Sequence, residues 1–92
     1  MNSLVEYIKD RIHQKYKNYE NEIYELKNNE KYLSAYLQCG DIQRDLIDLR
    51  KNIYDLWYVL DYSEMNEIEE YIKYLILNLD TIKEQCEKEG DF

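Results

Sequence analysis

The stretch DYSEMNEIEEY, residues 61–71, is a strongly acidic part of this sequence. It holds five carboxylates and no basic residue, and the next positive charge is Lys73. Such a group of acids could ligate a metal, form a general acid–base pair, line a solvated helix face, or present negative charge to another protein. Each use needs different companion residues, and the sequence can be searched for them.

A metal site finds no support in the residues around these acids. A calcium loop needs oxygen ligands at positions 1, 3 and 5, glycine at 6 and glutamate at 12. A loop that starts at Asp61 would instead place Met65, Asn66 and Ile72 at the last three of these positions. A carboxylate-bridged di-iron bundle needs Glu-x-x-His pairs, and the single histidine is His13. We therefore expect no metal and no cofactor.

Catalysis is equally unsupported. General acid–base chemistry needs a carboxyl group in a pocket that shifts its pKa, whereas these acids lie off the apolar heptad positions. His13 could activate Cys39 or Cys86, but the predicted helices place both cysteines at the opposite end of the bundle from His13. Gly40 and Gly90 are isolated, so no phosphate-binding loop is present. We expect no catalytic residue and no enzymatic activity.

Three segments with heptad spacing must position the acids. They predict helices over residues 3–39, 42–61 and 64–88, with short links that fold each helix back on the one before. The prediction is a single all-α domain, 1–92, built as an up-down-up bundle of three helices. The third segment has the most regular seam, and its apolar positions are Met65, Ile68, Ile72, Leu75, Leu79, Ile82 and Cys86.

The helix ends are predicted from capping residues. Gly40 is a natural stop because glycine takes the left-handed conformation without strain, and Asp41 and Ser63 are suitable N-caps for the next two helices. Ser3 has the same role for the first helix. Asn28–Asn29 is the weakest stretch, because asparagine is a poor helix former. A kink or break of the first helix at that point is the alternative to one continuous helix.

A continuous first helix would be longer than its two neighbours. At about 1.5 Å per residue it would extend roughly 54 Å, against about 30 Å and 37 Å for the others, so its start would overhang the bundle. Apolar side chains on the overhang should not remain in water as one stripe. We expect them to form the interface of a homodimer, and they are Leu4, Val5, Ile8 and Ile12. If the helix breaks, the arm folds back onto its own bundle instead.

The net charge of −8 excludes several kinds of ligand. Duplex binding depends on cationic contacts to phosphate, so we expect neither direct nucleic acid binding nor an anionic membrane. The charge is segregated: residues 1–31 hold six acidic and six basic residues, whereas residues 41–92 hold fourteen and six. Such self-repulsion costs stability. A basic protein partner is the natural complement.

Composition also bears on location and origin. The start of the chain has no basic region followed by an apolar run, no window approaches a membrane span, and two cysteines are too few for a disulfide scaffold. Lys, Asn, Ile and Tyr are common while Ala is nearly absent, which is typical of AT-rich bacterial or phage genomes. We expect a protein of the cytoplasm of a host bacterium.

Rows of acids along the second and third helices could imitate nucleic acid. Carboxylates three or four residues apart on a helix lie about 5–6 Å from each other, close to the separation of phosphates along one DNA strand. These rows are the predicted partner-binding residues, and they are Asp55, Asp61, Glu64, Glu67, Glu69, Glu70, Asp80, Glu84 and Glu87.

The eleven tyrosines offer a second kind of surface. Tyr54, Tyr58 and Tyr62 are spaced i, i+4, i+8 beside Trp57, which places them on one face of the predicted second helix. They either widen the apolar stripe with hydroxyls at the water boundary, or act as anchors for a partner, since Tyr and Trp are frequent hot spots.

In length, acidity, helicity and codon bias the chain resembles the small acidic phage-encoded DNA-mimic inhibitors, and within them the Arn-type anti-restriction proteins. No motif carries this resemblance. It implies a homodimer that occupies the DNA-binding surface of a basic DNA-binding protein, such as a modification-dependent restriction endonuclease of host defence. The alternative is a helical coiled-coil module or adaptor that binds a host regulator through its Tyr/Trp face.

Overall fold

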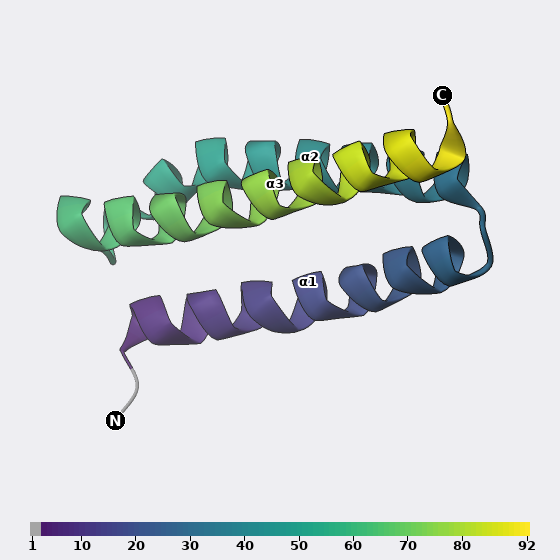
Figure 1. Ribbon diagram of the computed structural model, residues 1–92. Coiled ribbons are helices and arrows are strands. Elements are labelled where there is room, and N and C mark those ends of the chain that lie inside the picture. The colour runs from purple at the N-terminus through teal and green to yellow at the C-terminus, as the bar shows by residue number, and fades with distance from the viewer. Residues whose placement is uncertain (1–2) are drawn as a thin grey trace.

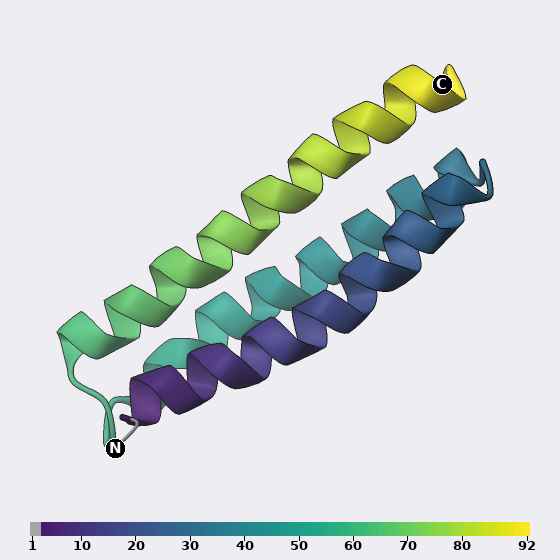
Figure 2. The same cartoon turned by 60° about the horizontal axis from the view of Figure 1, so that its bottom comes forward.

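The computed structural model describes residues 3–92 and consists of three antiparallel helices. They are α1 (Leu4–Asn28), α2 (Tyr32–Asn52) and α3 (Tyr62–Gly90), and the short 3-10 helix η1 (Ile53–Leu56) follows α2 directly. In Figure 1, α2 and α3 form one layer and α1 lies along it, whereas the turned view in Figure 2 shows α1 beside α2. The elongated bundle measures 47 × 23 × 14 Å. The predicted all-α, up-down-up bundle is confirmed.

The first helix ends at Asn28, so the predicted continuous helix over residues 3–39 is wrong and the alternative break is correct. The amide of Lys31 donates to the carbonyl of Leu26 at 2.9 Å, and the amide of Glu30 donates to that of Lys27 at 3.0 Å. This pair of bonds is the Schellman pattern that closes a helix C-terminus. Its left-handed position is taken by Glu30, with φ 60°, instead of the usual glycine. The chain then reverses and α2 starts immediately.

Gly40 lies in the middle of α2 and ends no helix, which corrects the predicted boundary between residues 39 and 42. Its φ is not positive, and Asp41 is an ordinary residue of the helix. A glycine inside a helix costs about 1 kcal/mol relative to alanine. That cost is tolerated here because the helix buries Ala35 and Cys39 before Gly40 and Ile42 just after it.

The second helix also ends earlier than predicted, and the third begins earlier. The α-helix stops at Asn52, and η1 takes over before the chain turns. Asp61, not Ser63, is the N-cap of α3: its carboxylate accepts the amide of Glu64 at 2.8 Å, and the Glu64 carboxylate accepts the amide of Asp61 at 3.0 Å. This reciprocal pair is a capping box. Ser3 caps α1 as predicted, accepting the amide of Glu6 at 3.2 Å.

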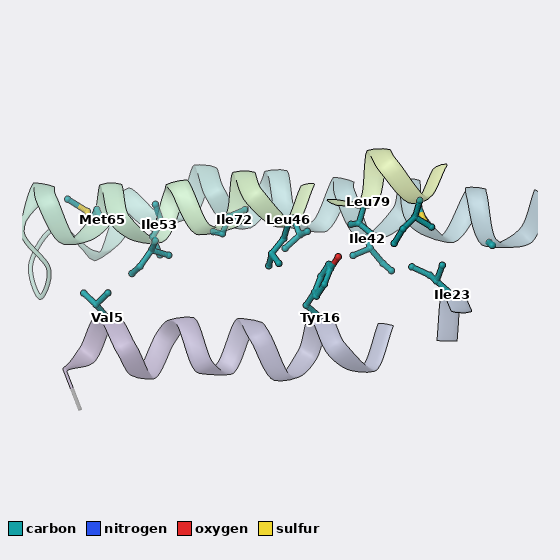
Figure 3. Packing of buried hydrophobic residues seen from close by; sticks show 14 of the residues in the cluster. Val5, Tyr16, Ile23, Ile42, Leu46, Ile53, Met65, Ile72 and Leu79 are labelled. Atoms are coloured by element: carbon teal, nitrogen blue, oxygen red, sulfur yellow. The ribbon is translucent and has the colours of Figure 1, made fainter. Parts of the chain in front are cut away.

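The start of α1 does not overhang the bundle, because the break near residue 29 makes α1 short enough to lie along α2 and α3. Val5 is only 4% exposed and faces Met65 and Ile53 in Figure 3. Ile8 and Ile12 pack partly buried against the same core. The reason to expect a dimer through Leu4, Val5, Ile8 and Ile12 is therefore absent, since only Leu4 is exposed. The homodimer itself stays a prediction.

Both cysteines lie in the core between α2 and α3. Cys39 and Cys86 are fully buried and are free thiols, so Cys39 is a core residue and not the helix-end residue that the predicted boundary implied. Burial raises the pKa of the Cys39 thiol to about 11 and raises that of Cys86 as well. Because the thiolate is the reactive form, neither side chain is suited to act as a nucleophile.

None of the helices over the described residues combines the length and the apolar character that crossing a bilayer requires.

The position of the helix break can be tested by changing which residue is glycine. Gly40→Ala should raise the free energy of unfolding by about 0.5–1 kcal/mol, since alanine is the better helix former and a Cβ at Gly40 meets no atom within 4 Å. Glu30→Gly should also stabilise, by roughly 1 kcal/mol, because it relieves the left-handed backbone. Urea unfolding followed by circular dichroism measures both changes. A break at Gly40 would reverse both signs.

Candidate protein-binding surfaces

Exposed aromatic side chains gather where η1 turns into α3. Trp57 is 74% and Tyr62 is 73% exposed, and Tyr58 and Val59 between them are also exposed. We call these four residues the aromatic end. The side chains of Ile53 and Leu60, on either side of the turn, are buried. These two buried side chains hold the segment in place, and the side chains of Trp57, Tyr58 and Val59 remain in solvent.

The aromatic rings do not form the helical face predicted from their i, i+4, i+8 spacing, because the α-helix ends at Asn52. Trp57 and Tyr58 are in contact edge to face, with ring centroids 6.3 Å apart. Tyr54 turns toward α3, where its hydroxyl donates to the carboxylate of Glu69 and its ring meets Tyr62 at 6.2 Å. The bond to Glu69 raises the pKa of the Tyr54 hydroxyl to about 12. Of the predicted anchors, Tyr54 is thus tied to the protein itself.

Further exposed apolar side chains lie at the same end of the bundle, and of these only Leu4 was singled out from the sequence, as part of a dimer interface. The first turns of α1 lie beside the start of α3 in Figure 1, and there Leu4 and Tyr7 are exposed. Tyr7 lies outside the apolar seam of α1, which includes Val5 and Ile12. That position in the heptad pattern could have predicted that the Tyr7 side chain is exposed. The exposure of Val59 could not be predicted from the sequence, because it depends on where α2 ends.

The aromatic end is surrounded by negative charge. Residues 53–72 contain six acidic residues and no basic one. Asp55, two residues before Trp57, is exposed, and no ion pair or side-chain hydrogen bond involves it within residues 3–92. A surface that combines free aromatic faces with the unpaired carboxylate of Asp55 suits a cationic and partly apolar partner.

Several of the predicted phosphate-mimic acids are engaged within the protein. Asp61 and Glu64 form the capping box of α3. Lys73 lies 4.0 Å from Glu69 and 3.5 Å from Glu70.

Two further acids of the set also have partners. Glu67 lies 4.0 Å from Lys9 of α1, and Asp80 accepts the side-chain amide of the buried Gln43 at 2.7 Å. Only Asp55, Glu84 and Glu87 show neither an ion pair nor a side-chain hydrogen bond among the described residues.

The acidic row on α3 is also interrupted. Between Glu70 and Asp80 the exposed positions are held by Tyr74 and Leu77. This stretch without an exposed acid extends about 15 Å along the helix at about 1.5 Å per residue. A continuous row of phosphate-like charges along α3 is therefore absent, although both ends of the helix remain acidic.

His13 has a partner within its own chain. Its Nδ1 lies 3.1 Å from the hydroxyl of Tyr71 on α3, a contact that the predicted overhang did not allow. Over residues 3–92 no group of three or more His, Cys, Asp or Glu side chains is placed to hold a metal ion.

No family model, curated protein or solved structure matches this chain.

The role of the capping box can be tested against the cap predicted from the sequence. Asp61→Ala should lower the free energy of unfolding by about 1 kcal/mol, as loss of an N-cap usually does. Ser63→Ala is the matched control and should change it by less than about 0.5 kcal/mol, as for an ordinary surface position. Thermal unfolding of both variants gives the comparison, and equal losses would contradict the assignment of Asp61 as the cap.

Proposed function

We propose that this protein is a helical interaction module that binds a basic protein partner, with the aromatic end as its anchor. The observation that carries the proposal is the exposure of Trp57 and Tyr62 within a segment, 53–72, that has six acids and no basic residue. Clustered exposed apolar side chains with a polar rim usually mark an interaction site.

Aromatic residues suit this role energetically. A Trp or Tyr ring buries a large area with few rotatable bonds, and such residues are enriched among interface hot spots. Trp57 and Tyr58 are held in edge-to-face contact, and the buried anchors Ile53 and Leu60 restrain the backbone on either side. Less entropy is then lost when a partner immobilises these rings.

The surrounding charge narrows the chemistry of the partner. Arg and Lys side chains are attracted to the faces of Trp and Tyr, and carboxylates such as that of Asp55 would add ion pairs at the rim. Rim charges chiefly accelerate association and select against acidic partners. A partner segment in which Arg or Lys stands next to an apolar residue could contact both the aromatic rings and the carboxylates.

A second candidate is an acidic DNA mimic that occupies the DNA-binding surface of a host defence nuclease. The observation that favours it is the segregation of charge, because the whole excess of eight negative charges falls in residues 41–92. Asp41, Asp45 and Asp48 add exposed carboxylates on α2. The interruption of the acidic row between Glu70 and Asp80 and the paired acids argue for the aromatic anchor as the first choice.

The aromatic anchor is testable because Trp57 is the only tryptophan. Its fluorescence should shift and saturate on titration with a peptide that alternates arginine and leucine. Trp57→Ala, followed by calorimetry, should weaken binding by about 2 kcal/mol, roughly 30-fold. Tyr74→Ala removes an exposed tyrosine elsewhere and is the matched control. A peptide that binds Trp57→Ala and wild type equally would contradict the anchor.

The DNA-mimic candidate makes a different prediction. Purified protein should compete with duplex DNA for a modification-dependent restriction endonuclease and should not itself shift duplex DNA in a gel. Changing Glu67, Glu70, Asp80, Glu84 and Glu87 together to Gln or Asn should abolish the competition while the helical content is retained. Single changes should cost only about 0.5 kcal/mol each. Competition that survives the fivefold change, or is lost with Trp57→Ala instead, would exclude the mimic.

A further inference from the structure

A groove runs between α1 and α2, on the side of the bundle away from α3. The two helices lie side by side in Figure 2, and the groove between them has a volume of about 820 Å³ and no lining residue from α3. Its floor is apolar: Ile12 and Tyr19 are half-buried and Leu49 is 37% exposed. An apolar floor open to water is energetically unfavourable, and a partner would bury it.

The two walls of the groove carry opposite charges. Arg11 and Lys15 of α1 form one wall, and Asp45 and Asp48 of α2 form the other. All four side chains are exposed. No ion pair within residues 3–92 includes any of them, although Arg44 of the same helix α2 pairs with Asp41. The opposite charges of the two walls are thus not paired with each other within the described part of the chain.

We propose that this groove is the interface for a second copy of the chain, related by a two-fold axis parallel to the helices. That axis places α1 of each copy over α2 of the other, so that Arg11 and Lys15 of one copy meet Asp45 and Asp48 of its partner, twice. A two-fold axis across the helices would instead place α1 on α1 and α2 on α2, with like charges in contact. The charge pattern therefore selects one symmetric arrangement.

The rest of the surface supports a second copy at this place. Each chain carries a net charge of −8, and copies repel each other over most of their surface. The four charges of the groove sum to zero, so repulsion is least there. Ile12, Tyr19 and Leu49 of both copies would be covered together.

This interface differs from the one predicted for the first helix, with which it shares only Ile12. It leaves the aromatic end and the outer side of α3 free, because neither contributes to the groove. The inference therefore does not depend on the proposed function, and a dimer would carry two aromatic ends for its partners.

The test uses charge reversal and rescue, with mass measured by sedimentation equilibrium. The wild type should form dimers. Arg11→Glu with Lys15→Glu makes both walls negative, and Asp45→Lys with Asp48→Lys makes both walls positive. Each double variant alone should show a dissociation constant raised roughly a hundredfold, because four favourable contacts become repulsive. An equimolar mixture of the two variants should recover the wild-type dimer, since every wall then again faces its opposite.

The matched control is Glu84→Lys with Glu87→Lys, which changes the net charge as much as the Asp45 and Asp48 changes do but lies outside the groove. It should leave the dimer as stable as in wild type or slightly more so. Circular dichroism establishes that each variant is folded. A wild type that is still monomeric at about 1 mM, double variants that dimerise as wild type does, or a mixture without recovery would each overturn the proposal.

Discussion

The reversal of the chain at residues 29–31 is the constraint on which the rest of the structure depends. Glu30 adopts a left-handed backbone, and the amides of Glu30 and Lys31 close the end of α1. Because the chain turns back there, α1 lies beside α2 and α3 and its own Val5 enters the core. The charged groove between α1 and α2 exists for the same reason, since it separates the two helices that this turn connects.

How far the sequence predicts the fold depends on how regular each seam is. The third helix was recognised because its apolar positions recur without interruption, and all of them, from Met65 to Cys86, are buried. The border of the first two helices was misplaced because Gly40 and Asp41 look like a stop followed by an N-cap. The true turn has Glu30 at its left-handed position, where propensity favours glycine. Only tertiary packing, which buries Ala35 and Cys39 ahead of Gly40, distinguishes a chain reversal at Glu30 from one at Gly40.

The candidate surfaces were predictable in composition but not in geometry. The excess of acids in residues 41–92 is plain from the sequence, yet a count of charges does not reveal that Asp61 and Glu64 cap a helix or that Glu69 is bound by Tyr54. The exposure of Trp57 likewise follows from the end of α2 at Asn52. An unbroken helix would have placed Tyr54, Tyr58 and Tyr62 in one row. Because the helix ends at Asn52, Tyr54 instead points toward α3, whereas Trp57 and Tyr58 remain in water.

The two buried thiols make the interior of the bundle accessible to kinetic study. Cys39 on α2 and Cys86 on α3 are both shielded from solvent, so a water-soluble alkylating reagent can reach them only when the helices separate. Where reclosing outpaces the reagent, the modification rate is proportional to the fraction of molecules that are open. Because both thiols lie in the core between α2 and α3, separation of these two helices exposes them together, and their modification rate reports how often this pair of helices opens.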